Sequence, residues 1–196
     1  MKNIALVMSL CLYFLVSVQT ASANPALQAA IDSDIRSDDD KGRDASRKPY
    51  ETLEFFEVAA DSDVLELIPG GGWYTKILGN YLRDSGSLTV AIGADAGRLG
   101  LEENDLEHVS IIGEDFEMVA TDLHRGIRDV TGSSLGENQF DTVLTFRNMH
   151  NMSESGRQFV NQAVFDALKP GGIYGVIDHT RRHICLLYTS PSPRDA

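Results

Sequence analysis

The segment from Val64 to Leu82 restricts the fold of this chain more than any other. A short apolar run, Val64 to Ile68, is followed by Pro69 and three consecutive glycines. Apolar residues then recur at intervals of three and four positions, at Tyr74, Ile77, Leu78, Tyr81 and Leu82. That spacing is typical of one face of an amphipathic helix. The segment therefore predicts a buried strand that a glycine turn joins to a helix.

Further strands and helices are predicted along the rest of the chain. Apolar runs predict strands at Leu88 to Ile92, Val109 to Ile112, Phe140 to Phe146 and Ile173 to Ile177. Apolar residues from Phe159 to Leu168 share one helical face, and Lys169-Pro170-Gly171-Gly172 is expected to end that helix. Strands that alternate with helices favour an α/β domain with a mostly parallel sheet and helices on both faces. Such sheets bind ligands beyond the carboxyl ends of their strands, where the glycine turn lies.

The first 23 residues have the pattern of a secretory signal. Lys2 precedes a nearly continuous apolar run from Ile4 to Val18, and Ala21-Ser22-Ala23 supplies a cleavage pattern. The run is shorter than the roughly 20 residues that span a bilayer. We therefore expect residues 1–23 to be a signal peptide, the protein to be exported and periplasmic, and no stable membrane span after cleavage. The alternative is an inner-membrane protein anchored through an uncleaved signal.

The mature chain is expected to begin with a helix and a charged linker over residues 24–45. Pro25 to Ile31 predicts the helix, and the polar stretch from Asp32 to Lys48 favours a solvated linker or lid. Pro49 suits the first turn of another helix, on which Leu53 and Phe56 share a face. The main domain is expected to cover residues 46–180.

The end of the chain differs from the rest. Periodicity stops after Thr180, and the run from Leu187 to Ala196 resembles translated library-adapter sequence. We therefore expect residues 181–196 not to be native and the domain to be truncated after its fifth strand. The alternative is a genuine disordered tail.

Composition excludes several classes of protein. The chain has 17 basic and 29 acidic residues, a net charge of −12, which argues against a nucleic-acid partner. Two cysteines cannot form a disulfide framework or a four-cysteine zinc site. His124, His150 and His179 do not have zinc-ligand spacing, so we expect no metal. A small-molecule substrate is the expected partner, and the oligomeric state cannot be predicted.

The glycine turn departs from two nucleotide-binding motifs. Thr75 stands where the dinucleotide fingerprint G-x-G-x-x-G has its third glycine, and no P-loop lysine follows. In contrast, Glu66-x-Ile68-x-Gly70-x-Gly72 resembles the acidic-x-Gly-x-Gly-x-Gly motif of class I S-adenosylmethionine (SAM) methyltransferases, with Ile68 at the first glycine.

Longer segments resemble one family within that superfamily. Val64 to Leu78, VLELIPGGGWYTKIL, is similar to the exported "predicted methyltransferase" family. Three other segments look like the same family: Arg47-Lys48-Pro49 with Leu53-x-Phe55-Phe56, Leu144-Thr145-Phe146-Arg147-Asn148-x-His150, and Leu168-Lys169-Pro170-Gly171-Gly172 with Asp178-His179. The resemblance covers about Asp44 to Thr180 and implies a Rossmann-like class I methyltransferase sheet.

The resemblance also implies site residues. Gly70, Gly71 and Gly72 would face the methionine end of SAM, and Glu66 would accept a hydrogen bond from its amino group. Asp115 and Phe116 look like the pair that meets the adenine. The acid that binds the ribose is absent from the end of the second strand, where Asp95 is the substitute.

Asn148 and His150 are the candidate catalytic residues, because they follow the fourth strand, where methyltransferases place residues that face the substrate. His150 is either a general base or a structural histidine. The expected function is SAM-dependent methyl transfer to an unknown acceptor by in-line displacement. The alternative is an exported, non-catalytic small-molecule-binding protein on the same scaffold.

Overall fold

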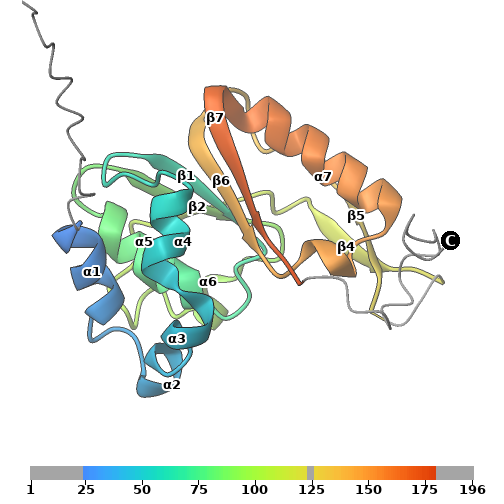
Figure 1. The fold of residues 1–196 in the computed structure, drawn as a ribbon. Coiled ribbons are helices and arrows are strands. Elements are labelled where there is room, and N and C mark those ends of the chain that lie inside the picture. Colours follow the sequence, from blue (N-terminus) through green and yellow to red (C-terminus); the bar gives the residue numbers. More distant parts are fainter. Residues whose placement is uncertain (1–23, 123–125, 180–196) are drawn as a thin grey trace, which may run out of the picture.

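A computed structural model describes residues 24–122 and 126–179 of the chain (Figure 1). The predicted signal peptide, His124 and the predicted non-native tail lie outside these residues. The described part contains a five-stranded sheet in the order β3-β2-β1-β6-β7, and every neighbouring pair in it is parallel. Its strands are β1 (Asp63–Leu67), β2 (Ser87–Ala91), β3 (Ser110–Ile112), β6 (Phe140–Phe146) and β7 (Leu168–Ile177). The predicted α/β sheet is confirmed.

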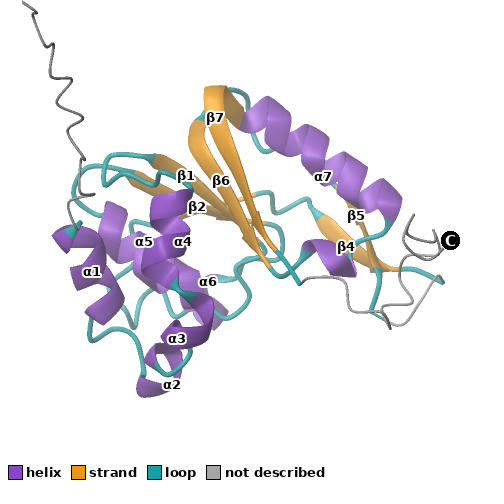
Figure 2. Ribbon diagram, viewed as in Figure 1, coloured by secondary structure: helices purple, strands orange, loops and turns teal. Residues whose placement is uncertain are grey.

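Helices cover both faces of the sheet (Figure 2). One face packs against α1 (Pro25–Asp32), α4 (Pro49–Phe55) and α5 (Trp73–Leu82), and the other packs against α7 (Glu154–Ala167). Side chains of β1 alternate between the two cores, with Val64 in the first and Leu65 and Leu67 in the second. No helix among the described residues is long and apolar enough to cross a membrane.

The order of the strands reverses at β1. The chain runs from β1 outward through β2 and β3, and then returns to place β6 on the other side of β1. Ligands of open α/β sheets bind beyond the carboxyl ends of the strands at such a reversal. The glycine turn and the residues after β6 both lie at this edge.

The charged segment after α1 differs from the expected solvated linker. It forms two short helices, α2 (Asp38–Lys41) and α3 (Asp44–Arg47). The side chain of Arg36 is 0% exposed, and its Nη1 and Nη2 donate to the Asp44 carboxylate at 3.0 and 2.5 Å. Nη1 also donates to the Ile31 carbonyl. Because one buried guanidinium joins α1 to α3, the segment packs on the domain.

This buried guanidinium predicts a large stability effect. Arg36→Met should lower the free energy of unfolding by about 3 kcal/mol, because it leaves the Asp44 carboxylate without its partner. Arg83→Met is the control, since Arg83 pairs with the exposed Asp105 at 3.0 Å and should cost less than about 1 kcal/mol. Urea unfolding measures both values, and equal losses would contradict a special role for Arg36.

The structure also contains elements that the sequence did not predict. These are the antiparallel hairpin of β4 (Glu117–Ala120) and β5 (Arg128–Thr131), the short helix α6 (Ala96–Leu99) and the 3-10 turn η1 (Met149–Asn151). The four residues of β4 are all exposed, so no alternation of apolar side chains marks the strand. In addition, β7 begins at Leu168, before the strand predicted from Ile173. Its pairing with β6 shifts in register between Phe140 and Thr142, and Pro170 lies within this irregular part of an edge strand, where proline is tolerated.

Candidate functional site

A cavity of about 240 Å³ lies at the carboxyl end of β1, and we call it the glycine-turn cavity. Three parts of the chain line it: the α2–α3 segment, the β1–α5 connection and the end of β6. The lining residues are Arg43, Arg47, Glu66, Ile68, Pro69, Gly70, Gly71, Trp73, Tyr74, Phe146, Arg147 and Asn148.

The backbone of the turn is open to this cavity at two of the three glycines. A Cβ atom built on Gly70 or Gly71 meets no other heavy atom within 4 Å. Gly72 is different, because its Cβ position lies 3.3 Å from a methyl carbon of Leu99 and its φ is +77°. Gly70 and Gly71 therefore line the cavity, whereas Gly72 is the N-cap of α5 and packs against α6.

Glu66 is the buried acid of the site. Its side chain lines the cavity, the residue is 2% exposed, and its Oε2 accepts a hydrogen bond from the Thr75 hydroxyl at 2.6 Å. Burial raises the pKa of Glu66 to about 7, although the hydrogen bond from Thr75 acts in the opposite direction. The carboxyl group is thus poised between its neutral and charged forms near neutral pH, so a cationic ligand group beside it would favour the charged form.

Asn148 joins the ends of β1 and β6. Its Nδ2 donates to the carbonyl of Ile68 at 3.2 Å and to the hydroxyl of Thr145 at 3.1 Å. Ile68 has a φ of +53°, a left-handed conformation that costs a β-branched residue about 1–3 kcal/mol. The resembled motif has glycine at this position, and the backbone conformation explains that preference. In this chain Asn148 helps to hold the strained residue.

Aromatic side chains form a wall of the glycine-turn cavity. The rings of Tyr74 and Phe146 are stacked, with centroids 3.5 Å apart and planes inclined by 10°. Trp73 is 6% exposed, and its Nε1 donates to the Asp40 carbonyl at 2.9 Å. The guanidinium of Arg47 lies 4.5 Å from the centroid of the Trp73 ring. Trp73 therefore lines the cavity and makes a cation–π contact with the guanidinium of Arg47.

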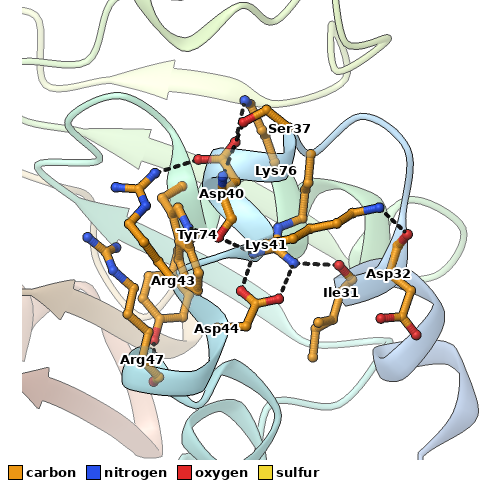
Figure 3. A network of polar contacts seen from close by, with 12 residues as sticks. Ile31, Asp32, Ser37, Asp40, Lys41, Arg43, Asp44, Arg47, Tyr74 and Lys76 are labelled. Carbon is orange, nitrogen blue, oxygen red and sulfur yellow. Dashed lines mark hydrogen bonds and ion pairs between the residues drawn. The ribbon is translucent and has the colours of Figure 1, made fainter.

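Ion pairs fix the α2–α3 segment beside the cavity (Figure 3). Asp40 pairs with Lys76 of α5 at 2.9 Å and with Arg43 at 2.5 Å. Burial by itself would raise the pKa of Asp40, but the hydrogen bonds with Lys76 and Arg43 hold that pKa below its usual value. The ionised Asp40 consequently anchors the segment that carries the arginines.

A second cavity of about 360 Å³ adjoins the first, and we call it the methionine-lined cavity. Ile68 and Asn148 line both. The other lining residues of the second are Met118, Gly126, Arg128, Asn151 and Met152. Met118 also approaches the end of β2, since its Cε lies 2.9 Å from the Cβ position of Gly93. The two cavities thus follow the carboxyl edge of the sheet on both sides of Ile68.

Besides Gly72, three of the predicted binding residues do not line either cavity. Asp95 is exposed, and its Oδ1 accepts the Arg98 backbone N–H at 2.7 Å as the N-cap of α6. Asp115 is exposed in the turn before β4. Phe116 is 7% exposed, with its ring 5.8 Å from that of Phe159. The ring of Phe116 is therefore part of the core under α7.

His150 forms a pair with Asp178 and lines neither cavity. Its Nδ1 lies 2.6 Å from Asp178 Oδ1, and its backbone N–H donates to Oδ2 at 2.9 Å. The ligand atoms of His150, Asp178 and His179 lie within 4.8 Å of one another, a grouping that the spacing of the histidines did not reveal. However, Arg147 Nε donates to His179 Nε2 at 3.2 Å, which places a guanidinium against one of these atoms. The contacts fit the structural interpretation of His150.

The sequence did not identify several lining residues as part of the site. These residues are Arg43, Arg47, Tyr74, Phe146 and Arg147. All of them except Arg43 belong to the segments that carry the family resemblance, and that membership was the available signal. Arg43 lies in the segment expected to be a linker, where nothing in the pattern of charges marked it.

Comparisons with known proteins bear on the fold of the chain rather than on its individual site residues. No protein family model matches the chain. A curated "uncharacterized methyltransferase" of Synechocystis sp. is 29% identical over 126 residues, which cover 64% of this chain and 51% of that protein. The chain thus spans about half the length of this relative.

Solved structures with a similar fold include coclaurine N-methyltransferase bound to N-methylheliamine and SAH. It is 12% identical, with a TM-score of 0.50 over 81% of this chain and 44% of that chain. The PH0226 protein of Pyrococcus horikoshii is 16% identical, with a TM-score of 0.51 over 72% of this chain and 55% of that chain. Together with the parallel sheet and its two helical layers, this likeness shows that the chain has a Rossmann-like, class I methyltransferase fold.

Proposed function

We propose that this protein is a SAM-dependent methyltransferase that acts on a small molecule. The observation that carries the proposal is the open backbone of Gly70 and Gly71 beside the buried Glu66, at the point where the strand order reverses. The likeness to a methyltransferase of Synechocystis sp. and to the fold of coclaurine N-methyltransferase supports it independently.

The two cavities match the two ends of SAM. The methionine end fits the glycine-turn cavity, where Glu66 accepts a hydrogen bond from the ammonium and Arg47 donates to the carboxylate. The nucleoside end fits the methionine-lined cavity, where Met118 and Met152 offer apolar contacts. Asp95 and Asp115 have no part in this assignment, because they lie outside both cavities.

The chemistry of the transfer requires little of the protein beyond placement. SAM supplies a methyl group whose bond to sulfur breaks with the electron pair left on sulfur, while a lone pair of the acceptor forms the new bond. A proton on the acceptor, where there is one, passes to water. Asn148 holds the ends of β1 and β6 together, and Tyr74 and Phe146 exclude water from one side. These residues therefore act by orientation and exclusion of water.

Calorimetry on the full chain tests the proposal. SAM and S-adenosylhomocysteine (SAH) should each bind at one site with a micromolar dissociation constant, whereas NADH, the control nucleotide, should not bind. Absence of binding by both SAM and SAH would refute the function. Binding of both ligands without methyl transfer to any acceptor in a broad small-molecule extract would refute catalysis and favour the non-catalytic alternative.

We also propose that the protein is exported to the periplasm. The support is the sequence pattern of residues 1–23, which lie outside the described part of the chain. Fractionation of cells that express the full chain tests this proposal. Recovery in the cytoplasm with an intact N-terminus would contradict it, and recovery in the inner membrane would favour the uncleaved anchor.

A further inference from the structure

Three guanidinium groups gather at one cavity of an otherwise acidic protein. The chain has a net charge of −12, yet Arg43, Arg47 and Arg147 all line the glycine-turn cavity. Arg43 and Arg47 come from the α2–α3 segment and extend to the same side of it (Figure 3), and Arg147 comes from the end of β6. Elements far apart in the sequence therefore bring like charges together, which costs free energy unless an anion compensates them.

The protein itself compensates this charge only in part. Arg43 pairs with Asp40, but that carboxylate also pairs with Lys76. The guanidinium of Arg47 has no hydrogen bond to any residue in the described part of the chain, and it rests over the Trp73 ring. Burial, followed by repulsion from Arg43 and Arg147, lowers the pKa of Arg47. Several N–H donors at the cavity consequently remain available to a ligand.

The arginines are held in place before any ligand binds. The buried pair of Arg36 with Asp44 fixes the start of α3, and the Arg47 carbonyl accepts a hydrogen bond from the Tyr74 hydroxyl at 3.4 Å. Arg147 has a φ of +64°, a left-handed conformation that is rare for this residue type. Strain of this kind is concentrated at ligand-binding sites, where it contributes to preorganisation. The cluster is therefore a built feature of the site.

The charge of the methyl donor requires a further anion. SAM carries an ammonium, a sulfonium and one carboxylate, so it enters a positive cavity with a net positive charge. Its carboxylate accounts for one guanidinium, that of Arg47, and its ammonium is balanced by Glu66. The sulfonium and the guanidinium of Arg147 then remain without counter-charge. We infer that the methyl acceptor is an anionic small molecule whose carboxylate or phosphate group binds Arg147, with Arg43 beside it. This inference rests on the proposed function and names the class of its acceptor.

The only tryptophan of the chain provides a direct test that does not require activity. Trp73 lies under Arg47, so its fluorescence should respond to an anion bound at the cluster. Phosphate and acetate are titrated separately into the full chain at constant ionic strength, with sodium chloride as the balancing salt. A saturable change with either anion is expected, and the anion that binds more tightly identifies the acidic group of the acceptor.

Two variants make the titration specific. Arg147→Met should weaken the binding of the preferred anion at least tenfold, whereas Arg83→Met should leave it unchanged, because Arg83 pairs with Asp105 away from the cavity. A wild-type response to phosphate and acetate that matches the response to chloride would overturn the inference. An equal loss of binding in both variants would also overturn it.

Coupling between the anion and the donor separates this inference from the proposed function. Saturating anion should tighten SAM binding by about fivefold or more. It should affect SAH less, because SAH has no sulfonium charge. Competition between the anion and SAM would mean that the arginines hold only the donor carboxylate, and the inference would fail while the function stood. If neither SAM nor SAH binds but phosphate or acetate saturates, the proposed function and the acceptor assignment fail together, and the anion site remains.

Discussion

Replacement of Gly71 with leucine is expected to abolish the binding of SAM and SAH while the protein stays folded. The Cβ position of Gly71 has no heavy atom within 4 Å, and its φ is not in the left-handed range, so the free protein accommodates a side chain. The leucine side chain would fill the part of the glycine-turn cavity in which the ligand lies against the backbone of Gly71. We expect affinity to fall by at least about a hundredfold, since about 3 kcal/mol of contact is lost.

Gly97→Leu is the matched control for this substitution. Gly97 also has an ordinary φ and room for a side chain, with its nearest neighbour an Asp95 oxygen at 3.6 Å, but it lies in α6 and lines neither cavity. Calorimetry should show normal affinity for Gly97→Leu, and thermal unfolding should show both variants close to the wild type. Normal SAH binding by Gly71→Leu would remove the glycine turn from the ligand site.

Replacement of Glu66 with glutamine is expected to stabilise the protein at high pH. Burial raises the pKa of Glu66 from 4.5 to about 7, so the native state holds a proton that the unfolded chain has already released between these values. The contribution of Glu66 to the free energy of unfolding is therefore fully present below pH 4.5, and it is lost as the pH rises through about 7. Glutamine stays neutral and can still accept the Thr75 hydrogen bond.

The expected gain in the free energy of unfolding at pH 8 is therefore about 3 kcal/mol, and it should disappear near pH 4.5. Urea unfolding of the wild type and Glu66→Gln across this range measures the gain. Glu51→Gln, at an exposed position on α4, is the control and should show no such dependence on pH. A constant difference between Glu66→Gln and the wild type would contradict the buried, titrating carboxyl group.

The same substitution should weaken ligand binding, although it stabilises the fold. Glutamine cannot balance an ammonium, and the loss of a charge-assisted hydrogen bond should raise the dissociation constant of SAH by about 10- to 100-fold. In the wild type, the ammonium selects ionised Glu66, so SAH affinity should fall as the pH decreases below about 7. Calorimetry from pH 5.5 to 7.5 tests this slope. Glu66→Gln should show a flat profile over the same range.

Sequence patterns that repeat within one element were sufficient to predict the centre of the fold. The buried strand, the glycine turn and the helix from Trp73 to Leu82 follow from periodicity and from the absence of side chains in the turn. The same local signals predicted β6 with its correct limits and α7 over most of its length. Strand topology predicted that the glycine turn lies at the ligand-binding edge of the sheet, and the family resemblance singled out Gly70, Gly71 and Glu66, which line the cavity there.

Tertiary structure alone decided the parts that depend on contacts between distant residues. The neighbouring residues in the sequence do not show that Arg36 is buried against Asp44. The α2–α3 segment therefore has the sequence pattern of a solvated linker, although in the structure it forms a wall of the glycine-turn cavity. The family resemblance implies that Phe116 meets the adenine of the ligand, but the ring of Phe116 lies in the core next to that of Phe159. Periodicity reports how a residue relates to its neighbours in the chain, whereas charge clustering and burial depend on which elements meet. For that reason the strand–turn–helix was readable from the sequence, and the convergence of Arg43, Arg47 and Arg147 was not.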